Sequence, residues 1–414
     1  MQILRLLASG VFVTSLWGCE GQIIGPPGPQ PPARSSWLSY KYSASCRDCP
    51  ELREPTEEID YYCSINIQGG SASSYPVVDC ANPQRASVSL ADWKDSNGFS
   101  PSDAPFLAAQ ARAIYGNLGD LRIGRDMNCV KSGFNGNVAC YVTNYGQPPF
   151  DPALGPNPLW LGANNFPQLG QAIEEAIVGH APFATVAMVY NKDAAINHGG
   201  VNAVTFYAFK GDGSLLLAPA LDFEGGKTSP RMCMACHGGE YDAATHSVTG
   251  AQFLPFDMFY FEHSSQAGYT LEDQQEAYRK LNNMVKDTLY DPTAAPGISD
   301  FISGTYHNAV ETPGAAADGN YVPLGWSGQQ ETKLYNSVYR KYCRMCHMAS
   351  RTRPFLTFED FRQLTAAIEN KVCQSTDMPN AQVPYVGFWQ DPVAQGDLRD
   401  FLKAQGLTDL HGCK

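Results

Sequence analysis

The chain has 414 residues, enough for two or three domains that each bury a core of their own. Hydrophobic residues make up 43% and charged residues 17%, as in ordinary globular proteins. The formal net charge of −12 argues against nucleic acid and against anionic lipid surfaces as partners, and it favours a basic protein partner.

The first nineteen residues have the pattern of a secretory signal, with Arg5 followed by an apolar run over 6–16. The signal ends in the letters LWGC, at Cys19, which resembles a bacterial lipobox. This resemblance implies that Cys19 is lipidated and tethers the chain to a membrane of the cell envelope. Because Glu20 follows in place of aspartate, the resemblance favours the outer membrane. The alternative is an ordinary cleaved signal with a chance cysteine.

Residues 20–36 form a linker with five prolines and three glycines, which behaves as a semi-stiff spacer. After it, residues 37–225 predict an α+β domain with an antiparallel sheet, whose role the sequence does not indicate. The expected elements are helices over 104–117 and 166–178 and strands over 183–190, 201–210 and 215–223.

Thirteen cysteines are present, and export would place them in an oxidising compartment. Cys129 and Cys140 flank an Asn-Gly turn signal between two apolar runs, which predicts a hairpin crossed by a disulfide. The Cys-x-x-Cys pair at 46 and 49 is followed by proline, not histidine, and is expected to form disulfides with Cys63 and Cys80.

Two pentapeptides have the pattern Cys-x-x-Cys-His: Cys233 to His237 and Cys343 to His347. This pattern is the attachment site of c-type haem, because two thiols reach the two vinyl groups of one porphyrin while the next residue places an imidazole on the iron. Two haem c groups are therefore expected. They are held by Cys233, Cys236, Cys343 and Cys346, with His237 and His347 as proximal ligands, each fixed by a backbone carbonyl at its second ring nitrogen. The alternative, a pair of redox sites or half of a zinc site, leaves both histidines unexplained.

Residues 226–325 surround the first motif. Thr270 and Asp273 predict a helix start, and the apolar face that follows is expected to pack on the first haem pocket or to cover the sheet. The distal ligand of the first iron stays open. Met258, twenty-one residues after His237, is the first candidate; the others are His263, His246, His198 and His180, or no protein ligand at all.

Residues 326–414 predict a helical region. Ser327 with Gln330 suggests a capping box, an apolar stripe leads into the second motif, and Asp391 precedes a closing helix. This order of elements resembles class I cytochrome c. The resemblance implies that Met378, thirty-one residues after His347 and followed by proline, is the distal ligand of the second iron. Cys373 and Cys413 bracket this segment and could form a disulfide.

These features predict an α+β chain with mainly α-helical haem-binding regions. The leading interpretation is a membrane-tethered dihaem cytochrome that transfers single electrons to redox proteins or cytochrome subunits. The alternative is a peroxidase-like or oxygenase-like enzyme whose open first iron is fed by the second. Such an enzyme needs a distal acid or base; Glu240, Asp242 and His246 lie just beyond the first motif, but they are expected to sit in solvent. A structural subunit of a cytochrome assembly is a third possibility.

Overall fold

The computed structural model describes residues 55–68, 80, 88–119, 121–148, 150–151, 155–156, 166–192, 204–220, 225–289, 291, 293, 295–350, 353–374 and 382–407. The strands are β1 (Leu107–Asn117), β2 (Gly124–Ser132), β3 (Val138–Tyr145), β4 (Phe150–Asp151), β5 (Gly155–Pro156), β6 (Ala184–Tyr190), β7 (Val204–Lys210), β8 (Glu240–Asp242), β9 (Ser247–Thr249) and β10 (Phe261–Glu262). The helices and helical turns are α2 (Pro55–Gln68), α3 (Leu90–Ser96), η1 (Pro101–Phe106), α4 (Phe166–Val178), α6 (Arg231–His237), η3 (Met258–Tyr260), α7 (Leu271–Asp287), α8 (Pro296–Thr305), η4 (Leu324–Trp326), α9 (Gln329–Leu334), η5 (Tyr335–Cys343), α10 (Arg344–His347), α11 (Phe358–Gln363), α12 (Thr365–Ile368), η6 (Glu369–Gln374), α13 (Gln382–Gln390) and α14 (Pro392–Ala404).

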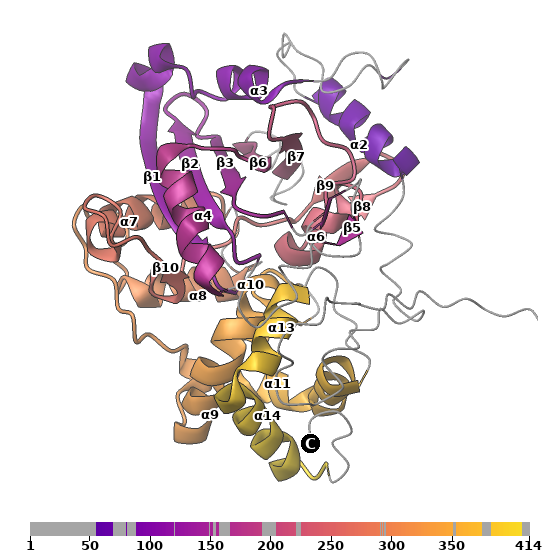
Figure 1. The fold of residues 1–414 in the computed structure, drawn as a ribbon, viewed down its shortest axis with the longest axis vertical. Coiled ribbons are helices and arrows are strands. Elements are labelled where there is room, and N and C mark those ends of the chain that lie inside the picture. The colour runs from indigo at the N-terminus through magenta and orange to yellow at the C-terminus, as the bar shows by residue number, and fades with distance from the viewer. Residues whose placement is uncertain are drawn as a thin grey trace, which may run out of the picture.

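Among the described residues, an antiparallel sheet of six strands forms the centre of the N-terminal part, in the order β10-β1-β2-β3-β6-β7. Helix α4 covers one face of this sheet (Figure 1). It packs closely because Gly116 and Gly124 are paired across β1 and β2 beneath it, and a Cβ atom at Gly124 would overlap the carbonyl oxygen of Ala172. Side chains alternate between faces along a strand, so the neighbours of these glycines point to the opposite face.

Two expectations for this region are corrected. The segment 104–117 is not a helix: a turn at η1 leads into β1, whose inner residues pair with β2. Local propensity favoured a helix here, but pairing and burial in the sheet outweigh a preference of a few tenths of a kcal/mol per residue. Of the strand expected over 215–223, the structure describes residues 215–220, and these form one bridge, between Leu215 and Phe209. The helix over 166–178 and the antiparallel strands β6 and β7 are confirmed.

The hairpin formed by β2 and β3 carries a disulfide between Cys129 and Cys140. These two residues are direct partners in the strand pairing, with Cα atoms 4.1 Å apart. The disulfide therefore joins neighbouring strands within the sheet.

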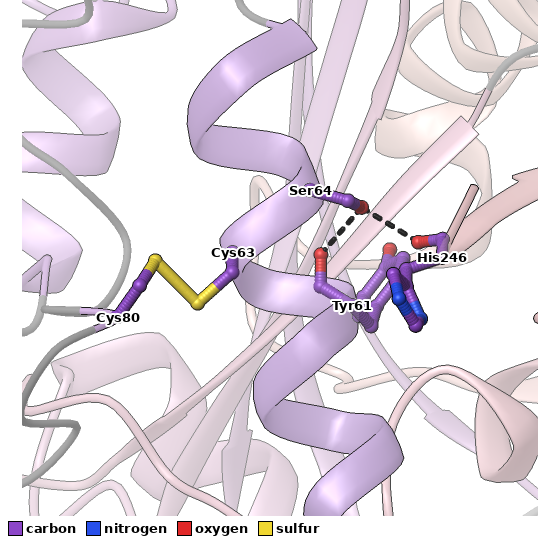
Figure 2. Close-up of a disulfide and its surroundings, with 5 residues drawn as sticks. All are labelled: Tyr61, Cys63, Ser64, Cys80 and His246. Carbon is purple, nitrogen blue, oxygen red and sulfur yellow. Dashed lines mark hydrogen bonds between the residues drawn. A yellow bond between two sulfur atoms is a disulfide. The ribbon is translucent and has the colours of Figure 1, made fainter. Parts of the chain in front are cut away.

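Helix α2 is tied to the chain by a disulfide between Cys63 and Cys80 (Figure 2). The expectation that Cys46 and Cys49 pair with these residues is therefore wrong. Only 17 residues separate Cys63 from Cys80, so closing this loop costs little chain entropy. Cys46 and Cys49 lie outside the described residues, as do Cys19 and the linker.

The sheet, α2, α7 and α8 share one hydrophobic core, which extends to Met348 and Ala349 just beyond the second motif. Helix α7 begins at the predicted cap, with Thr270 accepting a hydrogen bond from the backbone N–H of Asp273. It packs against β1, where the side chain of Gln274 bonds both backbone groups of Ile114. Helix α7 therefore lies against the sheet, and it also packs on the pocket beside the first motif, because Tyr278 contacts the rings of Phe256 and Phe261, which line that pocket.

The C-terminal region is helical and has a separate core around Trp326, Tyr335 and Phe361. Asp391 caps α14 by accepting from two backbone N–H groups, as the sequence predicted. The predicted capping box at Ser327 is wrong, because α9 starts one residue later, after Gly328 and without a side-chain cap. Figure 1 shows α10 at the boundary between the two regions, and it contacts α6 there. No helix among the described residues is long and apolar enough to cross a bilayer.

Candidate functional site

The two Cys-x-x-Cys-His segments lie on short helices. The first occupies α6, and the second begins at Cys343, the last residue of η5, and continues through α10. A helix places residues three and four apart on one side, so each motif turns its two thiols and its imidazole in a common direction. All four motif cysteines are thiols rather than halves of disulfides.

Both motif histidines are oriented by a backbone carbonyl, as predicted. Nδ1 of His237 lies 2.8 Å from the carbonyl oxygen of Gln252, and Nδ1 of His347 lies 2.9 Å from that of Arg353. A histidine that donates from Nδ1 binds a metal through Nε2. Burial lowers the pKa of His347, which favours the neutral imidazole that iron ligation needs.

The two motifs touch each other. Sγ of Cys236 lies 3.3 Å from Sγ of Cys346, although 110 residues separate them along the chain. Gly238, directly after the first motif, makes this approach possible. Its φ of 65° is in the left-handed region, and a Cβ atom there would overlap the carbonyl oxygen of Ala349. A side chain at this position would separate the motifs.

A buried ion cluster joins the same two segments. Asp257 directly follows Phe256 in the segment that packs beside the first motif. It accepts two hydrogen bonds from Arg340, of 2.8 and 3.0 Å, and it also pairs with Arg344 inside the second motif. Arg344 in turn donates to the hydroxyl of Tyr335 at 2.9 Å. Burial alone would raise the pKa of Asp257, but the charges of the two arginines outweigh it and lower that pKa.

The entry to α6 is also held by a buried carboxylate. Glu58 of α2 accepts hydrogen bonds from the backbone N–H groups of Ala218 and Ser229, the latter 2.9 Å away and two residues before the helix. Burial raises the pKa of Glu58 to about 7, although these bonds oppose the rise. Next to it, Glu57 forms an ion pair of 2.6 Å with Arg231, the first residue of α6.

A cavity of about 190 Å³, partly open to solvent, lies between the first motif and the face of the sheet opposite α4. Its floor comes from alternate residues of adjacent strands, because Tyr115 pairs with Arg125 and Met127 pairs with Val142. The ring of Phe206 on β7 lies 5.6 Å from that of His237, centroid to centroid. Further lining residues are Asn117, Asn144, Val186, Met188, Met232, Cys233, Cys236, Phe253, Leu254, Pro255, Phe256, Phe261 and Met345.

These residues fit a c-type haem. Two thiols and a carbonyl-oriented imidazole border an aromatic and apolar cavity that is partly open to solvent, which is the chemistry a c-type haem needs from its surroundings.

The second motif borders a smaller apolar cavity of about 30 Å³ within the helical core. Cys343 lines it together with Phe361, Val372 and Tyr385. Met378, the predicted distal ligand, lies between Val372 and Tyr385 in the sequence but outside the described residues. Cys373 is disulfide-bonded, but its predicted partner Cys413 also lies outside the described residues. The ligand role of Met378 and the pairing of Cys373 with Cys413 therefore stay predictions.

Of the described candidates for the first distal ligand, none lines the first cavity. Met258 is buried in the core of the sheet region, and His263 faces Tyr278 at 3.1 Å. His246 bonds Tyr241, and its carbonyl accepts from Ser64 (Figure 2). His180 follows α4, and His198 lies outside the described residues.

The thioethers that do line the cavity are those of Met127, Met188, Met232 and Met345. Sequence reasoning missed all four. Met127 and Met188 lie on strands, where the alternation of side chains between the two faces could have indicated them. No sequence pattern indicates Met345, because it belongs to the second motif and reaches the first cavity only through the contact between the motifs. Its Sδ lies 3.5 Å from the side-chain amide of Asn117.

The zinc alternative has no support in the geometry, since no three His, Cys, Asp or Glu side chains are grouped for a metal in the part of the chain that the structure describes. The sequence matches no family model, and comparison with curated proteins and with solved structures finds no similar protein. The function must therefore be argued from the two motifs and their surroundings.

Proposed function

We propose that the chain is a dihaem c-type cytochrome that transfers single electrons. Cys233, Cys236 and His237 would hold one haem, and Cys343, Cys346 and His347 the other. When bound, each haem supplies one-electron chemistry by cycling between ferrous and ferric iron.

The observation that carries this proposal is the contact between the motifs. Cys236 and Cys346 are each an attachment point for a porphyrin edge, and their sulfur atoms lie 3.3 Å apart. Two attachment edges held together in this way suit the passage of electrons from one site to the other. The ion cluster around Asp257 and the close approach at Gly238 hold this arrangement within the fold.

The sheet region has a role in this proposal. It supplies one wall of the first cavity, while Met345 of the second motif also lines that cavity. The first site is therefore complete only when both regions are docked. The class I cytochrome c likeness of 326–414, with Met378 as ligand, and the lipid anchor at Cys19 in the outer membrane belong to this proposal. Redox proteins or cytochrome subunits would be its partners.

The proposal is tested by the mass of the denatured mature protein. We expect an excess of two haem groups that survives denaturation, because thioether bonds are covalent. The double variants Cys233→Ser/Cys236→Ser and Cys343→Ser/Cys346→Ser serve as matched controls, and each should lose one haem mass. Absence of any excess mass in the unaltered protein would refute the proposal.

A second candidate is an enzyme with an open first iron, and the first cavity with no described histidine besides His237 favours it. Adding carbon monoxide to the reduced protein separates the two functions. Unchanged visible spectra of both haems would mean that both irons have two protein ligands, as in an electron carrier. Binding at one haem would favour the enzyme.

A further inference from the structure

We propose that Cys236 and Cys346 form a disulfide between the two motifs in the chain that has not yet received haem. The inference goes beyond the proposed function, since it concerns the two thiols alone. Their sulfur atoms lie 3.3 Å apart, so a movement of little more than 1 Å would bring them to the bond length of about 2.0 Å.

Pairing within a motif is disfavoured by the helix geometry. Cβ atoms three residues apart on a helix are separated by about 5–6 Å, whereas a disulfide needs about 3.5–4.5 Å. Cys233 and Cys236 have this spacing on α6. Linking them would draw these Cβ atoms together by about 1 Å or more, whereas the sulfur atoms of Cys236 and Cys346 are already in contact.

The geometry of the motif contact selects the second cysteine of each motif, because the sulfur atoms of Cys236 and Cys346 are the ones that meet.

The contact is a property of the fold. The buried pairing of Asp257 with Arg340 and Arg344 holds the second motif against the first region, and Gly238 allows the backbones to approach. These groups act whether or not the cysteines carry haem. The two thiols are thus kept side by side in the folded chain.

The reaction needs a disulfide oxidant, for which glutathione disulfide is suitable. One thiolate attacks it and releases one glutathione thiolate, and the second thiolate then attacks the mixed disulfide and releases the other. Overall, the two cysteines lose two electrons and two protons, and one glutathione disulfide becomes two glutathione molecules. Both products are stable in the oxidising compartment that the signal predicts.

A link of this kind would block both haem sites at once, because each porphyrin needs both thiols of its motif. Haem attachment would then require a thiol reductant to return two electrons to the pair. Loading of the two sites is coupled through this single bond.

The test uses the full chain produced without haem attachment, incubated with glutathione disulfide and digested with trypsin under non-reducing conditions. Cleavage after Arg344 separates the cysteines of the second motif onto peptides 342–344 and 345–351, while peptide 232–279 carries both cysteines of the first. Peptides 126–131 and 132–192, joined by the Cys129–Cys140 disulfide, report that the folded sheet has oxidised.

We expect peptide 232–279 to be linked to 345–351. The link should be lost in Cys236→Ser and Cys346→Ser and kept in Cys233→Ser and Cys343→Ser. Unlinked peptides alongside an intact Cys129–Cys140 link, or a link between 342–344 and 345–351, would overturn the inference. Failure of the proposed function is distinguishable, because it is measured by haem mass in the mature protein and leaves this link unaffected.

Discussion

Replacing Asp257 with asparagine tests whether the buried ion cluster holds the two regions together. The side chains of Asp257 and Arg344 are 9% and 7% exposed, so the substitution leaves a buried guanidinium without its counter-charge. Breaking a buried pair in this way costs about 3–5 kcal/mol of the free energy of unfolding. We expect about 3 kcal/mol, because asparagine keeps one acceptor oxygen and Arg344 keeps its contact with the ring of Phe301.

The measurement is urea unfolding followed by tryptophan fluorescence, to which Trp326 and Trp389 in the helical core contribute. With an m value of about 3 kcal/mol/M, the midpoint should fall by about 1 M. Glu311→Gln is the matched control, because the Lys286–Glu311 pair is exposed and such pairs contribute about 0–1 kcal/mol. Equal midpoints for Asp257→Asn and the control would refute the reasoning.

Three further predictions follow from single residues. Burial raises the pKa of Glu58 from 4.5 to about 7, so the carboxyl group ionises at lower pH in the unfolded chain than in the folded one, and the free energy of unfolding should fall by about 3 kcal/mol as pH rises from 4.5 to 7. Thermal unfolding at several pH values should show a smaller fall for Glu58→Gln than for the unaltered protein. Equal pH dependence in the two proteins would contradict this prediction. Gly238→Ala should lower the free energy of unfolding by about 1–3 kcal/mol more than Gly268→Ala does. Both glycines have positive φ, but only Gly238 of the two lies against the backbone of another segment, at Ala349. Similar melting temperatures of the two variants would contradict the close approach of Gly238 to Ala349. Met378→His should lower the potential of the second haem in a redox titration, because a thioether favours ferrous iron more than imidazole does, and an unchanged potential would remove Met378 from the coordination sphere.

Local patterns predicted those elements whose stability is local. The cap at Thr270, the start of α14 at Asp391 and the hairpin between Cys129 and Cys140 all depend on neighbouring residues, and the structure has each of them. The segment 104–117 was expected to be a helix, although β1 pairs with the next strand, β2. The inner half of β1 is buried at consecutive positions, so it lacks the alternation by which a half-buried strand is recognised.

The candidate site divides in the same way. Two thiols and an imidazole at fixed spacing are a property of five consecutive residues, so the proposal of haem and of His237 and His347 as its ligands comes from the sequence alone. The cavity wall formed by alternate sheet residues, the place of Met345 in the first cavity and the contact of Cys236 with Cys346 depend on segments that are distant along the chain. Only tertiary packing brings these residues together. Burial of a shared core and pairing of buried charges can join residues at any separation along the chain, so no sequence spacing predicts these contacts.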